Sequence, residues 1–533
     1  MVCFGISLLI TTSFGRKNND MKQIKKWVST WSWQQYVVIA LLGVALFTRF
    51  YNLSGTVQFL GDQGRDALIV SRIFTARDPV FIGPVTSVGN MYLGPLYYYF
   101  MLPFLWLTYP SPMGPVYAIA GLGVATVFLL YYLGKELVGS KVALLAAGLY
   151  TFSATVTSLA RFSWNPNPAP LISLIMIWAL HRAFKKSVWY WVVVSLCFAI
   201  LIQLHYITLL SGVSFAVFWL YQLGTLLRGR TAAKQKKLKQ FGMTTLVSAG
   251  VIVMSLLPLL LFDWKHSWLN VHAFSQLFVG NDTFKVATDQ GNRFLRAVAE
   301  SQGRAMHILF EISIGAFRTL NELLLLVVAV VLANVVRTKK NRKNFLGELI
   351  CIVFLLVGIM GTALYEHSIF DHYIAYLFPI TFLILAIVLH EVAKIRFVGP
   401  VLSLFFLVYF LQYNVPRMSF GDTGWTLQDM QRTSQAISER VQPGEKYNIV
   451  LLSESGDIDG QNYRYFLSTT ENPPVLTEER GSVETLFIIN EDRVLDRVVD
   501  SPVYEIVVFP EKDPKEVFEI PGGPEITVLR KSE

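Results

Sequence analysis

The chain has 533 residues, of which 53% are hydrophobic and only 16% are charged. A soluble domain is closer to one quarter charged and less apolar, so the composition argues against a soluble protein. Three cysteines, Cys3, Cys197 and Cys351, are too few and too scattered for a disulfide framework or a metal cluster. The net charge of +9 does not indicate a nucleic-acid-binding protein, because the basic residues cluster in short runs between apolar segments.

Residues 1–33 are predicted to be a cytoplasmic segment. The opening MVCFGISLLITTSFG is too short to span a bilayer and has no basic region before it, so we expect no signal peptide. Met21 opens a more typical start, basic and then apolar, so either Met1 or Met21 begins the protein.

Residues 34–413 are predicted to form a polytopic α-helical membrane domain of about 11–13 transmembrane helices, since a span needs roughly 20 apolar residues. The predicted spans are 34–51, 92–108, 114–133, 142–160, 169–184, 188–204, 207–225, 242–262, 317–336, 345–365, 374–393 and 397–413.

Short basic runs orient these spans. The runs at 22–26, 228–239, 337–343 and 394–396 are expected in the cytoplasm. The outer face then receives 51–91, 263–316, 366–373 and everything after about 413. An inner N-terminus and an outer C-terminus require an odd number of crossings, but twelve spans are predicted. One segment between 92 and 225 is therefore re-entrant, split or miscounted, and the short pair around IQLHYITLL is the first suspect.

Residues 414–533 are predicted to be a small extracytoplasmic α/β domain. A helical stretch, TLQDMQRTSQAISERV, precedes three short apolar runs, YNIVLLS, TLFIIN and YEIVVF, with turn signals such as QPGE and IPGG. These runs are expected to be strands. The domain has no phosphate-binding glycine loop.

The outer loop 51–91 carries FLGDQGRDALIV, with Asp62, Arg65 and Asp66 close together. The following DALIVSRIFTA has apolar residues at helical spacing, which predicts a short helix along the membrane surface. If that helix begins early, Asp62 and Asp66 share one of its faces. The alternative is an ordinary solvated loop in which Asp62 is an N-cap.

Other polar side chains lie beside or within apolar runs, where desolvation is costly, so they are functional candidates. The alternative for each is a polar helix end or an anchor at the headgroups. No histidine or carboxylate spacing matches a zinc motif. The candidates are Arg161, Trp164, Asn165 and Asn167, then Gln203, His205 and Tyr206, then Glu366, His367, Asp371, His372 and Tyr373.

An acidic motif after the first span, a Pro-Leu-aromatic re-entry, many helices and an outer C-terminal domain resemble the GT-C class of membrane glycosyltransferases. The likeness is to the protein O-mannosyltransferases of family 39 and the lipid A aminoarabinose transferases, and it covers roughly 30–415. Asp62 aligns with the family's catalytic Asp and Arg65 with its Arg. Gln63 replaces the usual Glu, and Asp66 stands at an aromatic position. Weaker matches are Leu93-Gly94-Pro95-Leu96, which lacks the family's His, Ala160-Arg161, and His372-Tyr373.

The resemblance implies an inverting glycosyltransferase of the cytoplasmic membrane, with its active site on the extracytoplasmic side. A polyprenyl-phosphate sugar would be the donor, and a protein, a lipid or a polysaccharide the acceptor. No cofactor is certain, but a divalent cation (Mg²⁺ or Mn²⁺) could bind Asp62 and Asp66. The expected catalytic residues are Asp62, as general base, and Asp66; the donor-phosphate ligands are Arg65, Arg161, His205, His372 and Tyr373; the substrate contacts are Gln63, Asn165 and Tyr206.

Two other functions stay open. A transporter or flippase of lipid-linked saccharides would also be polytopic with charges at the midplane, although no repeated halves are visible. A polymerase or ligase would use the same donor type, and its motifs would lie in a late outer loop such as 263–316.

Overall fold

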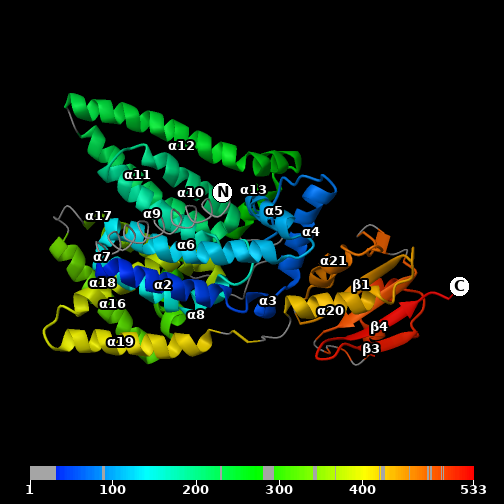
Figure 1. The fold of residues 1–533 in the computed structure, drawn as a ribbon. Coiled ribbons are helices and arrows are strands. Elements are labelled where there is room, and N and C mark those ends of the chain that lie inside the picture. The colour runs from blue at the N-terminus through cyan, green and yellow to red at the C-terminus, as the bar shows by residue number, and fades with distance from the viewer. Residues whose placement is uncertain are drawn as a thin grey trace, which may run out of the picture.

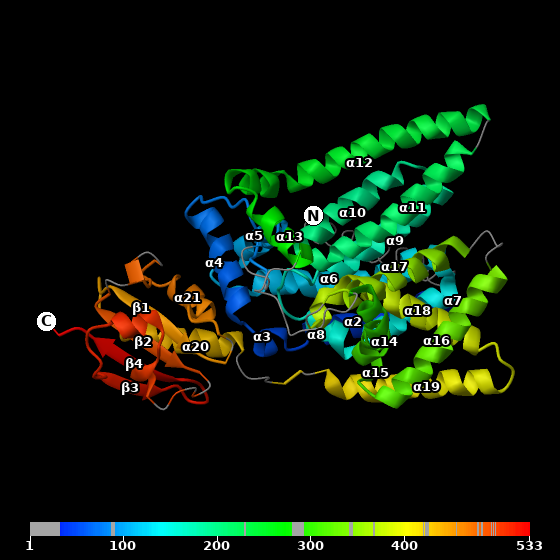
Figure 2. The ribbon, with the colours of Figure 1, turned by 180° about the vertical axis from the view of Figure 1, so that it is seen from behind.

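The computed structural model describes residues 32–532 except 87–90, 229–230, 280–292, 340–344, 366–367, 419, 422–425, 455, 477–478, 481–482, 492, 494 and 496. Most of the predicted N-terminal segment, and the candidates Glu366 and His367, lie outside the described residues. A long helical bundle carries a small sheet domain at one end, which we call the sheet end (Figures 1 and 2).

The helices of the bundle coincide with the predicted apolar segments. Within the described residues, eight helices are long and apolar enough to cross a membrane, and two shorter ones, α7 and α10, are also apolar. The prediction of a polytopic helical membrane domain is therefore confirmed. The bundle helices are α2 (Trp33–Phe50), α5 (Leu96–Thr108), α6 (Met113–Val138), α7 (Ser140–Phe152), α8 (Ala154–Leu159), α9 (Ala169–Lys185), α10 (Tyr190–Leu204), α11 (Leu209–Leu227), α12 (Ala232–Lys265), α16 (Arg318–Lys339), α17 (Phe345–Ala363), α18 (Phe378–Val392) and α19 (Val398–Asn414).

The core of the bundle lies around α18. Every residue from Phe378 to Leu389 is buried, so this helix is apolar on all sides and enclosed by its neighbours. Shorter elements lie at the sheet end and in the connection between α12 and α16. They are α3 (Leu53–Thr56), α4 (Gly61–Thr75), α13 (Leu269–Val279), α14 (Arg293–Met306), a π-helical turn at His307–Glu311, α15 (Ile312–Ile314) and 3-10 turns at Tyr206–Thr208, Asp371–Leu377 and Val415–Arg417.

Helix α5 accounts for the conflict over the number of crossings. Its 13 residues reach only about 20 Å, against a hydrocarbon core of about 30 Å. Both of its ends lie against α4 at the sheet end. Tyr98 Oη donates to Asp66 3.3 Å away, and the Tyr109 ring packs 5.3 Å from the Phe74 ring. Segment 92–108 therefore returns to the side from which it came.

Without 92–108, eleven of the twelve predicted segments remain among the described residues. An odd number fits the chain path, because α2 and α19 both run toward the sheet end (Figure 1). At IQLHYITLL, α10 and α11 are joined by a short 3-10 turn at Tyr206–Thr208.

The C-terminal domain is a four-stranded mixed sheet of order β1-β2-β4-β3. β1 and β2 are parallel, while β4 is antiparallel to both of its neighbours. Every residue of β1 and β2 is buried, so both faces of these strands are covered. The elements are α20 (Leu427–Ser438), β1 (Tyr447–Leu452), α21 (Gln461–Leu467), β2 (Thr485–Asn490), a 3-10 turn at Val498–Asp500, α22 (Tyr504–Val508), β3 (Glu516–Glu519) and β4 (Glu525–Arg530).

The predicted helix and the first two predicted strands are present, but the strand prediction for YEIVVF is wrong. This run is the helical turn α22, in which Ile506 is buried while Val507 and Val508 are exposed. Ile506 and Phe509, three residues apart, face the core together, which is a helical spacing. The strands β3 and β4, which complete the sheet, were not predicted.

The C-terminal domain docks on the segment between α3 and α4. Leu427 N donates to Val57 O (2.9 Å), and Gln58 forms an isolated β-bridge with Thr426. The ring of buried Phe59 lies 5.8 Å from Tyr465 and 5.5 Å from Phe466. The domain therefore sits directly beside the start of α4.

Candidate active site

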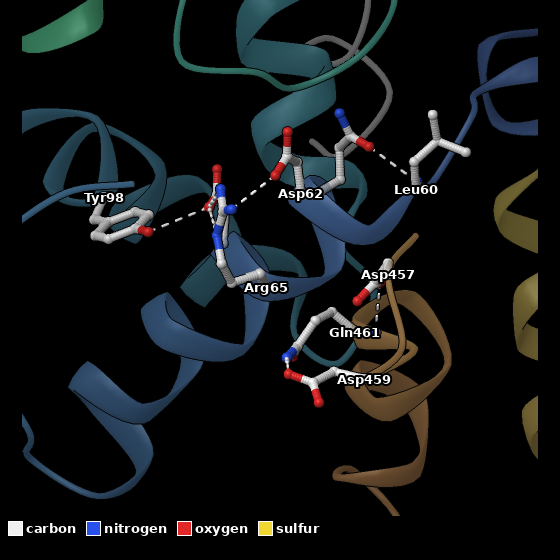
Figure 3. A network of polar contacts seen from close by, with 9 residues as sticks. Leu60, Asp62, Arg65, Tyr98, Asp457, Asp459 and Gln461 are labelled. Carbon is white, nitrogen blue, oxygen red and sulfur yellow. Dashed lines mark hydrogen bonds and ion pairs between the residues drawn. The ribbon is translucent and has the colours of Figure 1, made fainter. Parts of the chain in front are cut away.

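Helix α4 carries the acidic motif, and Gln63 fixes where it begins. The backbone N–H of Leu60, the N-cap, donates to Gln63 Oε1 (2.9 Å), the contact drawn as a dashed line beside Leu60 in Figure 3. The Gln63 side chain is buried. Asp62 is therefore not the N-cap, contrary to the alternative considered from the sequence. It lies in the first helical turn, where a negative charge is favoured by the helix dipole.

Arg65 bridges the two carboxylates of the motif. Its Nη1 lies 2.7 Å from Asp62 Oδ1, and its Nη2 lies 2.8 Å from Asp66 Oδ1 (Figure 3). The early start of α4 thus brings Asp62, Arg65 and Asp66 together, as their spacing predicted. The two acids differ in access: the Asp62 side chain is 45% exposed, whereas that of Asp66 is 1% exposed.

Asp66 pairs with Arg65 from the buried side of the guanidinium. Its Oδ1 also accepts from Tyr98 Oη at 3.3 Å, while its buried Oδ2 has no hydrogen-bond partner among the described residues. Burial raises the pKa of Asp66 to about 6, although the Arg65 guanidinium opposes that shift. The pKa of Arg65 is raised: its burial would lower it, but both carboxylates outweigh that effect.

The rate of the sugar transfer that the sequence predicts should fall as the pH drops through about 6, because a neutral Asp66 no longer holds Arg65 by charge. The same shift has an opposite effect on stability: since the folded-state pKa exceeds the ordinary 3.8, Asp66 stabilises the fold at low pH, and this contribution is lost as the pH rises through 6. A pH–rate profile of Asp66→Asn should lack the step near 6. An unchanged step in that variant would contradict the assignment.

Three of the predicted residues form an aromatic cluster with Trp164. The His205 ring lies 4.5 Å from Tyr373, the His372 ring lies 4.5 Å from Tyr373, and the Trp164 ring lies 4.1 Å from His372, measured between centroids. The segments before α9, after α10 and before α18 thus converge on one place. The Asp62 carboxylate is near enough to His372 for its charge to be felt there, so the aromatic cluster and the α4 motif lie at the same end of the bundle.

The remaining predicted residues make contacts within the fold. Asn165 Nδ2 donates to Leu204 O (2.5 Å), and Tyr206 Oη donates to Tyr92 O (2.5 Å). Arg161 donates to Thr48 O (2.9 Å), Tyr51 O (3.0 Å) and Thr56 Oγ1 (2.6 Å), which ties the loop before α9 to the end of α2.

Replacing Arg161 by Gln should lower the free energy of unfolding by roughly 1–3 kcal/mol, because buried acceptors at the end of α2 (Thr48 O) and in α3 (Thr56 Oγ1) lose their donors. The KM for the lipid-phosphate donor that the sequence predicts should stay unchanged in the same variant. Thermal unfolding and initial rates check both quantities. A raised KM with unchanged stability would instead support the phosphate contact predicted from the sequence.

Two groups were missed from the sequence. Asp457 and Gln461 of the C-terminal domain lie against the start of α4 (Figure 3). His307, on the π-helical turn, lies 2.8 Å from Glu311 and 3.4 Å from Asp371, next to the aromatic cluster. The signal for the first was the pair of glycines flanking Asp62, a pattern of close packing. No local pattern indicated the second, because His307 and Asp371 are 64 positions apart.

A divalent cation does not fit the α4 motif as it is arranged. The guanidinium of Arg65 occupies the space between Asp62 and Asp66, so an ion there would have to displace it. Within the described residues, no group of three His, Cys, Asp or Glu side chains is placed to hold a metal ion.

A family model described as dolichyl-phosphate-mannose-protein mannosyltransferase matches residues 94–255, from just before α5 into α12. The fold is similar to the crystal structure of ArnT from Cupriavidus metallidurans bound to undecaprenyl phosphate. The TM-score is 0.59 at 13% identity, over 93% of this chain and 98% of that chain. No curated protein matches the sequence.

A second similar structure is the archaeal oligosaccharyltransferase AglB from Archaeoglobus fulgidus, in complex with an inhibitory peptide and a dolichol-phosphate. The TM-score is 0.50 at 12% identity, over 87% of this chain and 70% of that chain. At such identities the likeness concerns the fold. The resemblance to the GT-C class is therefore confirmed: this chain has the GT-C fold of membrane glycosyltransferases.

Proposed function

We propose that the chain is an inverting glycosyltransferase that moves a sugar from a polyprenyl-phosphate donor to an acceptor, with Asp62 as general base. The observation that carries this proposal is the half-exposed Asp62 carboxylate, held by Arg65 beside the His372 cluster, on a GT-C fold. The fold neighbours bound to undecaprenyl phosphate and to a dolichol-phosphate support a lipid-phosphate donor.

The reaction would proceed in one displacement. An acceptor O–H or N–H group attacks the anomeric carbon, its proton passes to Asp62, and the bond from that carbon to the phosphate oxygen breaks. The electron pair leaves with the prenyl phosphate, and the configuration at the anomeric carbon inverts. Asp62 suits the role because it is exposed to an acceptor while Arg65 fixes its orientation. Asp66 is too buried to meet the acceptor, so it acts through Arg65.

The leaving phosphate needs positive charge or hydrogen-bond donors, because it departs as an anion. Arg65 and the cluster of His205, His372 and Tyr373 lie at the site and are the proposed ligands. The contacts of Arg161 with the end of α2 make it a weaker candidate.

The proposed setting is the cytoplasmic membrane, with the sheet end outside. The basic run at 394–396, between α18 and α19, favours the opposite end of the bundle for the cytoplasm. A donor with its prenyl tail in the bilayer would then present its phosphate to the site from the side, and the acceptor would arrive from outside.

The test uses the full-length chain in proteoliposomes with a panel of prenyl-phosphate sugars. Release of prenyl phosphate, together with a glycosylated product of inverted anomeric configuration by NMR, is the expected result. Retention of configuration would overturn the single displacement. Movement of intact donor across the bilayer without release of prenyl phosphate would favour a flippase instead.

A further inference from the structure

The two glycines that flank Asp62 form a contact surface for the C-terminal domain. A Cβ atom on Gly64 would overlap the backbone of Gln461 and Asn462, at the start of α21. A Cβ atom on Gly61 would overlap the carboxylate of Asp457. Because the two positions are three apart on a helix, they share one face of α4. Because neither glycine has a side chain, the backbones of α21 and α4 can approach each other closely (Figure 1).

Asp457 lies at the centre of this contact. Its Oδ2 accepts from Gln461 N (3.1 Å), at the start of α21, and the same oxygen faces Gly61, the first residue of α4 (Figure 3). One carboxylate thus sits beside the positive ends of two helices. Burial raises the pKa of Asp457, and the carboxylates of Asp459 and Asp62 add to the rise. Asp62 directly follows Gly61 in the chain, so it lies next to this contact.

Apolar and polar contacts hold α21 in place around Asp457. The Phe59 ring, just before α4, packs between Tyr465 and Phe466 of α21. Tyr465 Oη also donates to Pro110 O (2.9 Å), in the link between α5 and α6. These contacts tie α21 to the segment before α4 and to the α5–α6 link. Any shift of α21 would therefore be transmitted to the first turn of α4, which carries Asp62.

We propose that the C-terminal domain positions Asp62 for reaction, by docking α21 on the first turns of α4 through Gly61, Gly64 and Asp457. Transfer then requires the docked domain. Asp457 is a positioning residue that acts through α4, not a group that touches the substrate. The inference rests on the proposed function and adds a role for the C-terminal domain and for both glycines.

Gly64→Ala should reduce kcat by about 10²-fold with little change in the KM for the donor, because the added methyl group meets backbone and displaces α21 from α4. The matched control is Gly43→Ala in α2, where an added Cβ meets nothing within 4 Å. It should keep wild-type kcat. Wild-type kcat in Gly64→Ala would overturn the proposal.

A disulfide tests docking without relying on a loss of activity. A Cβ on Gly61 would lie 3.3 Å from Asp457 Cβ, close to the roughly 3.5–4.5 Å found in disulfides. The variant Gly61→Cys/Asp457→Cys should be slow when reduced, because the carboxylate is gone. Oxidation should form the disulfide and restore most of the lost kcat, since the covalent link then holds α21 on α4 in place of the Asp457 contact.

The outcomes separate the two proposals. If the disulfide forms and the rate does not recover, or if no disulfide forms, the docking role is wrong while transfer by the wild type stands. If the wild type transfers no sugar from any prenyl-phosphate donor, the proposed function is wrong. Disulfide formation, read by a gel shift, then still reports whether α21 lies on α4.

Discussion

Replacing Asp62 by Asn should lower the rate of sugar transfer by about 10²–10⁴-fold, the usual contribution of a positioned general base. Asn has nearly the same shape, and its oxygen still accepts from Arg65, so the first turn of α4 should keep its structure. Because the Asp62 side chain is 45% exposed, its ion pair with Arg65 contributes at most about 1 kcal/mol to the free energy of unfolding. The unfolding temperature should therefore change little. The measurement is kcat with a prenyl-phosphate sugar, alongside the unfolding temperature.

The matched control for Asp62→Asn is Asp78→Asn. Asp78 also forms an exposed pair with an arginine, Arg72, at 2.8 Å, but it lies beyond the far end of α4. Its replacement should leave transfer unchanged. Near-normal turnover of Asp62→Asn, with intact expression, would remove the general-base role. The first turn of α4 would then contribute only packing.

The helical bundle could be predicted from the sequence because a span in lipid must be long, apolar and helical, and such runs are visible locally. The prediction that 92–108 crosses the membrane was wrong for a different reason. This segment is apolar throughout, but its length was judged from composition, and residues 92–95 are not helical. Whether a helix of 13 residues crosses or returns depends on its contacts with Asp66 and Phe74, which sequence spacing does not contain.

The site could be predicted in part. Asp62, Arg65 and Asp66 lie within one helical turn of each other, so their contacts follow from local geometry. The convergence of His205 with His372 depends on three segments meeting, and only their polarity within apolar runs indicated it. The glycines beside Asp62 signal close packing on α4, but they do not identify Asp457 as the neighbour, because its place beside α4 arises from docking between distant parts of the chain.

Removing Arg65 should cost both stability and activity, and a second change should separate the two. In Arg65→Met, the buried Asp66 carboxylate loses its charged partner, and breaking a buried pair in this way costs up to about 3–5 kcal/mol. Asp62 also loses the group that orients it, so kcat should fall by about 10²-fold or more.

The double variant Arg65→Met/Asp66→Asn removes the unpaired buried charge, and the Asn oxygen can still accept from Tyr98. Its unfolding temperature should return toward that of the wild type, while kcat stays as low as in Arg65→Met. This result would show that Asp66 acts by pairing with Arg65, and that the loss of kcat comes from the loss of Arg65 itself. If kcat recovered together with stability, the loss in Arg65→Met would have come from unfolding, and the phosphate and orienting roles would pass to His205, His372 and Tyr373 alone.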